Sequence, residues 1–295
     1  AVHIPIPGDV GTIGILFALL QRKRIFIRHC GNWLQPRTVA ERFWKFGMEA
    51  LAGRKNAMLA TGGGPAPPSA RNSNIEWIFA TSLTKKQLIP LKRQSGYRNR
   101  PRLIIACRQE ERKGTDVVIK SLPRILRAFP NADLTIAGGG SHLDRFKALA
   151  GTYGVSENVR FLGQLSQKNV LRHLEESDIF CFPTSASEGF PKAVLEALAA
   201  GLPVVTTRVS VLPQLLSYGG GVLLDAPDPE KVADAVIEIL SDPERYEEMS
   251  KSAIETAREY TLENWQERIG EFLMRSWSID QPFRRCDQEH PVPPI

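Results

Sequence analysis

Short apolar runs alternate with amphipathic segments between residues 103 and 224. Because the runs are apolar on both faces, they are typical of strands in a sheet that is covered on both sides. The amphipathic segments between them predict helical crossovers and therefore a parallel, doubly wound sheet. Ligands of such sheets bind outside the carboxyl ends of the strands. The predicted strands are LIIA (103–106), LTIA (134–137), VRFL (159–162), DIFCF (178–182), PVVTT (203–207) and GVLL (221–224).

The first hundred residues are less regular. RIFIRH (24–29) and EWIFAT (76–81) predict strands, and VAERFWKFGMEAL (39–51) predicts a helix. GTIGILFALL (11–20) is too short to cross a bilayer, which takes about 20 residues, and predicts a buried helix. Its basic residues follow the apolar run, whereas a signal peptide carries them before it. We therefore expect a cytoplasmic protein, with peripheral contact at the inner membrane face as a further expectation.

Composition marks the domain boundaries. TGGGPAPPSARNSN (61–74) is too rich in Gly and Pro to be regular, and RQSGYRNRP (93–101) has the composition of a linker. Helices are expected from Pro229 onward, followed by a tail without periodicity. The predicted domains are residues 1–96, residues 97–272 and a C-terminal tail of residues 273–295.

Charge and cysteine content narrow the range of partners. The formal charge of +6 suits phosphates or anionic lipids, but the basic residues are dispersed and match no nucleic-acid-binding module. We therefore expect no nucleic acid as a partner. Cys30, Cys107, Cys181 and Cys286 are far apart and lack the spacing of metal ligands. Reduced thiols and no metal site are expected.

The segment PTSASEGFPKAVLEALAAGLPVV (183–205) carries the strongest chemical signal. It leaves a predicted strand, forms a polar loop and enters a helix, with Pro191 expected in the first helical turn. Free amides at such a helix start attract a phosphate or a developing anion.

Two carboxylates, Glu188 and Glu196, flank this helix start. A carboxylate can accept hydrogen bonds from two vicinal hydroxyls, as binding of a ribose or hexose requires. The alternative is a simple helix-terminal charge for Glu188 and an exposed Glu196. Because Glu196 lies among apolar neighbours, where an unpaired charge is costly, the functional interpretation is favoured.

A second polar segment follows the run at 103–106, in ACRQEERKGTDVVIKSL (106–122). Arg108 and Lys113 are two cations at a strand end, where they could neutralise negative charge that grows on a ligand. The alternative is a solvated loop whose own acidic residues neutralise its basic ones. The presence of Glu188 and Glu196 downstream favours the functional interpretation of Arg108 and Lys113.

The segment at 183–205 resembles the E-x7-E signature of the group 1 family of retaining GT-B glycosyltransferases. The segment at 106–122 resembles the family segment that follows the first strand of the donor domain. The resemblance implies that Glu188 faces the donor sugar, that Glu196 binds the ribose, and that Arg108 and Lys113 clamp the diphosphate. Cys107 departs from the family, which usually has Gly there. The resemblance also implies contacts to sugar and diphosphate from Gly189, Phe190, Pro191 and Val194, contacts to the base from Gln164 and Leu165, and a position near sugar and acceptor for His29.

The resemblance further implies an α/β fold with two Rossmann-like doubly wound domains. The N-terminal domain is expected to be incomplete, because the opening segment resembles the middle of the family's acceptor domain. The implied reaction moves a sugar from a UDP- or GDP-linked donor to a glycan or lipid-linked acceptor hydroxyl, with retention of configuration. No D-x-D occurs in the sequence, so no metal bridge to the diphosphate is expected. The resemblance implies a hexosyltransferase without a cofactor that acts in glycan or polysaccharide biosynthesis.

Two other functions stay open from the sequence. The chain could be a non-catalytic subunit that binds a nucleotide sugar and partners another chain, or it could self-associate to complete its first domain. It could also be a sugar-nucleotide epimerase on the same fold. A transferase transfers the sugar, whereas a non-catalytic subunit only binds the donor. An epimerase forms a product from the donor when no acceptor is present.

Overall fold

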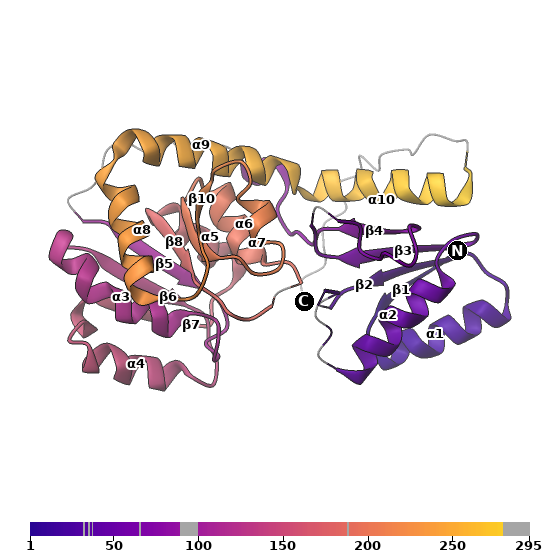
Figure 1. The fold of residues 1–295 in the computed structure, drawn as a ribbon, viewed down its shortest axis with the longest axis horizontal. Helices are drawn as coiled ribbons and strands as arrows, with labels where there is room; N and C mark the ends of the chain where they lie inside the picture. The colour runs from indigo at the N-terminus through magenta and orange to yellow at the C-terminus, as the bar shows by residue number, and fades with distance from the viewer. Residues whose placement is uncertain are drawn as a thin grey trace.

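The structure is a computed structural model that describes residues 1–279 except 32, 35, 37, 65, 89–99 and 188. Two parallel sheets form two lobes (Figure 1). The first lobe is built on a four-stranded sheet in the order β1-β2-β3-β4. Its strands are β1 (Val2–Ile6), β2 (Ile25–His29), β3 (Asn56–Thr61) and β4 (Ile75–Ile78).

Helices cover both faces of the first sheet. On one face α1 (Asp9–Leu20) contributes Ile15, and α2 (Val39–Leu51) contributes Trp44 and Met48, to a core with the strands. The α2 helix starts at a capping box in which Thr38 and Glu41 satisfy each other's backbone amides. The C-terminal helix α10 (Leu262–Trp277) returns from the second lobe and covers the opposite face (Figure 1).

The second lobe is built on a six-stranded parallel sheet in the order β10-β9-β8-β5-β6-β7. The strands β6 and β7 are added on one side of β5, and β8, β9 and β10 are added on its other side. The strands β5 and β8 are therefore neighbours. Its strands are β5 (Arg102–Ala106), β6 (Asp133–Ala137), β7 (Val159–Gly163), β8 (Ile179–Phe182), β9 (Val204–Thr207) and β10 (Gly221–Leu224). Its helices are α3 (Thr115–Ala128), α4 (Leu143–Thr152), α5 (Gln167–Glu175), α6 (Lys192–Ala199), α7 (Leu212–Leu215), α8 (Pro229–Ser241) and α9 (Pro243–Glu259).

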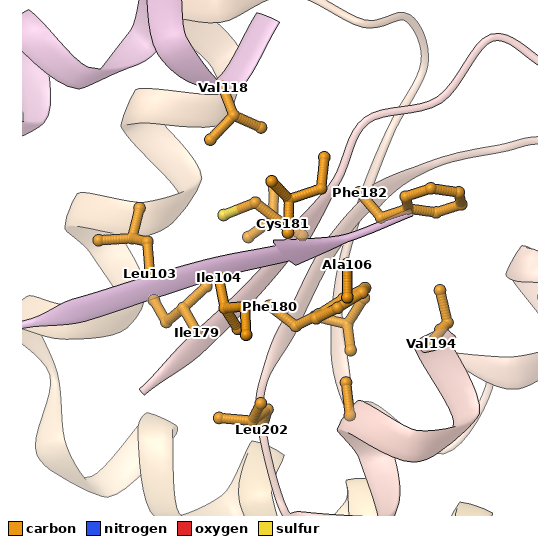
Figure 2. Packing of buried hydrophobic residues seen from close by; sticks show 14 of the residues in the cluster. Leu103, Ile104, Ala106, Val118, Ile179, Phe180, Cys181, Phe182, Val194 and Leu202 are labelled. Atoms are coloured by element: carbon orange, nitrogen blue, oxygen red, sulfur yellow. The ribbon is translucent and has the colours of Figure 1, made fainter. Parts of the chain in front are cut away.

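The core of the second lobe lies on both sides of its central strands. Figure 2 shows Val118 of α3 on one side of β5, and Val194 of α6 and Leu202 on the other. All three side chains are fully buried. The doubly wound sheet predicted from the two-sided apolar runs is confirmed, because every predicted run in this lobe forms a strand.

The first lobe departs from the sequence predictions in four places. The strands β1 and β3 were not predicted, because Pro in VHIPI and the Ala-rich NAMLAT weaken the strand pattern. The β4 strand ends at Ile78, before the predicted residue 81. Helix α1 forms but is not buried: Val10 and Leu20 are 86% and 80% exposed, since the sheet covers one side of the helix. Finally, α10 continues through the expected start of the tail at residue 273.

Candidate active site

A cleft of about 600 Å³ opens at the carboxyl ends of the strands of the second lobe. The loops after β5, β6 and β7 form one side, and the end of β8 with the start of α6 forms the other. This is the position that the parallel sheet predicts for a ligand. Seven residues proposed from the sequence line the cleft together: Arg108, Lys113, Gln164, Leu165, Phe190, Pro191 and Glu196.

The Glu196 carboxylate is held in place by residues from both lobes. It lies within α6 and is 8% exposed. Its Oε1 accepts hydrogen bonds from Gln167 Nε2 at 2.9 Å and from Ser82 Oγ at 3.4 Å. Burial raises the pKa of Glu196, and these two hydrogen bonds oppose that shift. Both bonds end on the same oxygen, so neither donor occupies Oε2.

Gln167 and Ser82 were not identified from the sequence. Gln167 begins α5, and its Nε2 also donates to Ser82 Oγ at 2.9 Å. Ser82 follows β4 of the first lobe and is 114 positions from Glu196. No local motif signals such a contact, because it depends on how the two lobes meet.

The two proposed cations lie in the loop between β5 and α3. The Arg108 side chain is 73% exposed, and its Nη1 lies 3.2 Å from Glu110 Oε1. Exposed ion pairs of this kind contribute little, so Arg108 can exchange this partner for a ligand phosphate. Lys113 is half-buried and lines the same cleft. Both cations therefore line the cleft that Glu196 also lines.

Gln109, which sequence reasoning missed, organises this loop from beneath. Its buried side chain donates to the carbonyls of Cys107 at 2.9 Å and Ala137 at 3.2 Å. Its Oε1 accepts a hydrogen bond from Thr115 Oγ1 at 2.8 Å. Gln109 thereby fixes the loops after β5 and β6 to the start of α3.

Arg112 is a second missed residue. Its Nη2 donates to the carbonyl of Ser185 at 2.9 Å, and its own carbonyl accepts a hydrogen bond from Thr184 Oγ1 at 2.9 Å. Thr184 and Ser185 belong to the polar loop after β8. Arg112 therefore connects the loop of the cations to the loop of the predicted acid Glu188, which itself lies outside the described residues.

The rest of the Glu188 loop lies against the first lobe. A Cβ on Gly189 would be 3.3 Å from the carbonyl oxygen of Gly31. The Phe190 ring lies 6.2 Å from Phe79 and 5.6 Å from Tyr260, measured between centroids. Phe79 and Tyr260 lie where the chain leaves and re-enters the first lobe, so this loop contacts both connections between the lobes.

The start of α6 differs by one residue from the sequence prediction. Pro191 is the capping residue, and the helix begins at Lys192. The Val194 side chain is fully buried in the core, and its amide donates to the carbonyl of Pro191 at 3.1 Å. Val194 does not line the cleft.

His29, at the end of β2, is fully buried and outside the lining of the cleft. Its ring meets Trp33 edge-on at 5.2 Å, and within the described part of the chain neither ring nitrogen makes a hydrogen bond of normal geometry. Burial lowers the pKa of His29, and the Glu41 carboxylate and the Gly31 backbone oppose this only in part.

This environment predicts a pH dependence of stability. The unfolded chain takes up a proton on His29 near pH 6.5, whereas the folded chain resists it. Stability is therefore present above pH 6.5 and is lost as the pH falls through this window. His3 shifts in the same direction, so the measurement compares urea unfolding of wild type and His29→Gln. We expect the stability advantage of wild type over the variant to decrease from pH 7 to pH 5. An advantage that does not change with pH would contradict the assignment.

A protein-family model described as "Glycosyl transferases group 1" matches residues 90–256. Among individual proteins, the chain is 31% identical over 185 residues to the GDP-mannose-dependent alpha-(1-6)-phosphatidylinositol monomannoside mannosyltransferase of Mycolicibacterium smegmatis. That alignment covers 60% of this chain and 47% of the relative. This chain is also 33% identical over 193 residues to the D-inositol 3-phosphate glycosyltransferase of Corynebacterium urealyticum. The alignment covers 63% of this chain and 45% of that relative. The matches span about half the length of these relatives.

Solved structures share the two-lobed fold. The Anabaena HepE protein in complex with UDP and glucose superposes with a TM-score of 0.72 at 16% identity, covering 92% of this chain and 77% of that one. WaaG, a glycosyltransferase involved in lipopolysaccharide biosynthesis, gives a TM-score of 0.63 at 15% identity, covering 92% and 85%. These similarities identify the fold as GT-B. Because the family model covers more than half of the sequence, the chain belongs to the group 1 glycosyltransferases.

Proposed function

We propose that the cleft of the second lobe binds a nucleoside diphosphate sugar and that the chain acts in sugar transfer with retention of configuration. The observation that carries this proposal is the buried Glu196 carboxylate in one cleft with Arg108 and Lys113. A carboxylate can accept hydrogen bonds from ribose hydroxyls, and two cations can neutralise the charge of a diphosphate. The names of the relatives favour a GDP- or UDP-linked hexose as donor and a glycan or lipid-linked acceptor.

In this mechanism the protein supplies position and electrostatics. Glu196 accepts hydrogen bonds from the ribose hydroxyls, and Gln164 and Leu165 lie along the base. Arg108, Lys113 and the first amides of α6 stabilise the negative charge on the departing diphosphate. The acceptor hydroxyl attacks on the face that the diphosphate leaves, and a phosphate oxygen takes its proton. Glu188 is proposed to lie near the sugar, and no metal takes part in the proposed reaction.

The two domains are proposed to bind different substrates. We assign donor binding to residues 97–272 and acceptor binding to residues 1–96, with α10 as the covering helix.

Glu196→Ala should weaken binding of GDP or UDP roughly tenfold to a hundredfold, the size of losing hydrogen bonds to a charged group. Isothermal titration calorimetry measures the affinity. The matched control is Glu157→Ala, which removes an exposed acid of the same lobe. Equal affinities in wild type and Glu196→Ala would remove the central claim.

A transfer assay then tests the reaction itself. Donor with acceptor should yield a product of retained anomeric configuration, measured by NMR, and the rate should survive EDTA. Loss of activity that magnesium or manganese restores would contradict transfer without metal. A changed sugar nucleotide formed without acceptor would instead identify an epimerase, and binding without turnover a non-catalytic subunit.

A further inference from the structure

Large apolar side chains are exposed almost entirely on the first lobe. Of the fourteen that are exposed in the described part of the chain, eleven lie within the first 46 residues. The second lobe, which is larger, exposes two tyrosines. This concentration indicates a surface with a role of its own, since soluble proteins scatter such residues singly.

Helix α1 carries the largest group. Five of its exposed residues recur at intervals of three or four and form one stripe, opposite the buried Ile15 and Ala18. Their exposed fractions range from 56% to 86%. From Val10 to Leu20 the helix contains no charged residue. Its members are Val10, Ile13, Leu16, Phe17 and Leu20.

Helix α2 lies on the same side of the first sheet as α1 (Figure 1). Its exposed residues Val39, Phe43 and Phe46 also recur at helical spacing, opposite the buried Trp44 and Met48. We refer to these three residues together with the α1 stripe as the apolar face. Both stripes point away from the sheet, because the opposite side of each helix packs against it.

The same lobe carries the positive charge of the protein. Residues 1–88 contain twelve Lys and Arg against four Asp and Glu, a net charge of +8. The whole chain has +6, so residues 89–295 carry a net charge of −2. Exposed Arg22 and Lys23 directly follow α1, and exposed Arg42 lies on α2 beside Phe43 and Phe46.

We propose that the apolar face docks on an anionic lipid surface. Apolar side chains would enter the boundary between headgroups and acyl chains, and the flanking basic residues would contact the lipid phosphates. A second copy of the chain is a poorer occupant, because it would bring two lobes of charge +8 together. With twelve residues, α1 extends about 18 Å, against a hydrocarbon core of about 30 Å. No helix in the described ranges is long and apolar enough to cross a membrane. In the proposed contact α1 lies along the lipid surface.

Cosedimentation with vesicles tests this proposal. Wild type should bind vesicles of phosphatidylcholine mixed with phosphatidylglycerol much better than pure phosphatidylcholine, and high salt should weaken binding. The variant Phe17→Ser/Leu20→Ser should lose at least about tenfold in partitioning. The variant Arg22→Gln/Lys23→Gln should lose roughly fivefold for each charge.

Matched controls lie on the second lobe. The pairs Tyr153→Ser/Tyr218→Ser and Lys168→Gln/Lys231→Gln change two exposed aromatic residues and two exposed basic residues of the second lobe. Both variants should bind vesicles like wild type. Affinity for GDP or UDP, measured on every variant, reports an intact fold and separates this proposal from donor binding.

Two results would overturn the proposal. The first is equal binding to neutral and anionic vesicles, or no binding to either. The second is a dimer in light scattering without lipid that Phe17→Ser/Leu20→Ser dissociates, which would make a second copy the occupant of the apolar face.

Discussion

Arg108→Ala and Lys113→Ala should each lower kcat/KM for sugar transfer by roughly tenfold to a thousandfold, the loss expected when one charge-stabilising group is removed. Both side chains line the cleft that holds Glu196. Their effect should be largest on the rate, because the charge on the diphosphate grows as the bond to the sugar breaks. Steady-state kinetics measures the rate, and calorimetry with the free nucleoside diphosphate measures ground-state binding.

Two further variants sharpen this test. Lys168→Ala removes an exposed cation outside the cleft and should leave both readouts unchanged. Glu110→Gln removes the acidic partner of Arg108 and should preserve or tighten diphosphate binding, because Arg108 no longer has a competing partner. Wild-type kinetics in both Arg108→Ala and Lys113→Ala would show that these cations are merely solvated.

Gly138→Ala should lower the free energy of unfolding by about 2–5 kcal/mol, combining left-handed strain with overpacking. Gly138 has a φ of +118°, and a Cβ there would lie 1.9 Å from the carbonyl oxygen of Cys107. That carbonyl belongs to the loop of the cations, so the site should be displaced as well. Urea unfolding measures the loss.

Gly154→Ala is the matched control. Gly154 also has a positive φ, of +66°, but a Cβ there meets nothing within 4 Å. It should lose about 1–2 kcal/mol from backbone strain alone. A loss at Gly138 no larger than at Gly154 would show that the loops after β5 and β6 can separate without cost.

The residues of the cleft were largely accessible from the sequence. Glu196 was predicted to be a functional acid because it stands among apolar neighbours, and its burial agrees with that reasoning. Arg108 and Gln164 follow runs that are apolar on both faces, and such runs are strands whose ends meet at one edge of the sheet. The residues that organise the loops were not accessible in this way. Gln109 and Arg112 look like part of a charged loop, and their partners at Ala137 and Ser185 come from other strands.

By itself, the sequence determined the strands of the second lobe and the edge at which a ligand is expected. Both depend on the local periodicity and on the parallel topology that this periodicity implies. The tertiary structure alone decided which side of each element is covered. Helix α1 is apolar on all sides, so its composition could not show that one stripe packs on the sheet and the other is exposed. Likewise, only the meeting of the two lobes brings Ser82 to Glu196, since no local rule relates residues 114 positions apart.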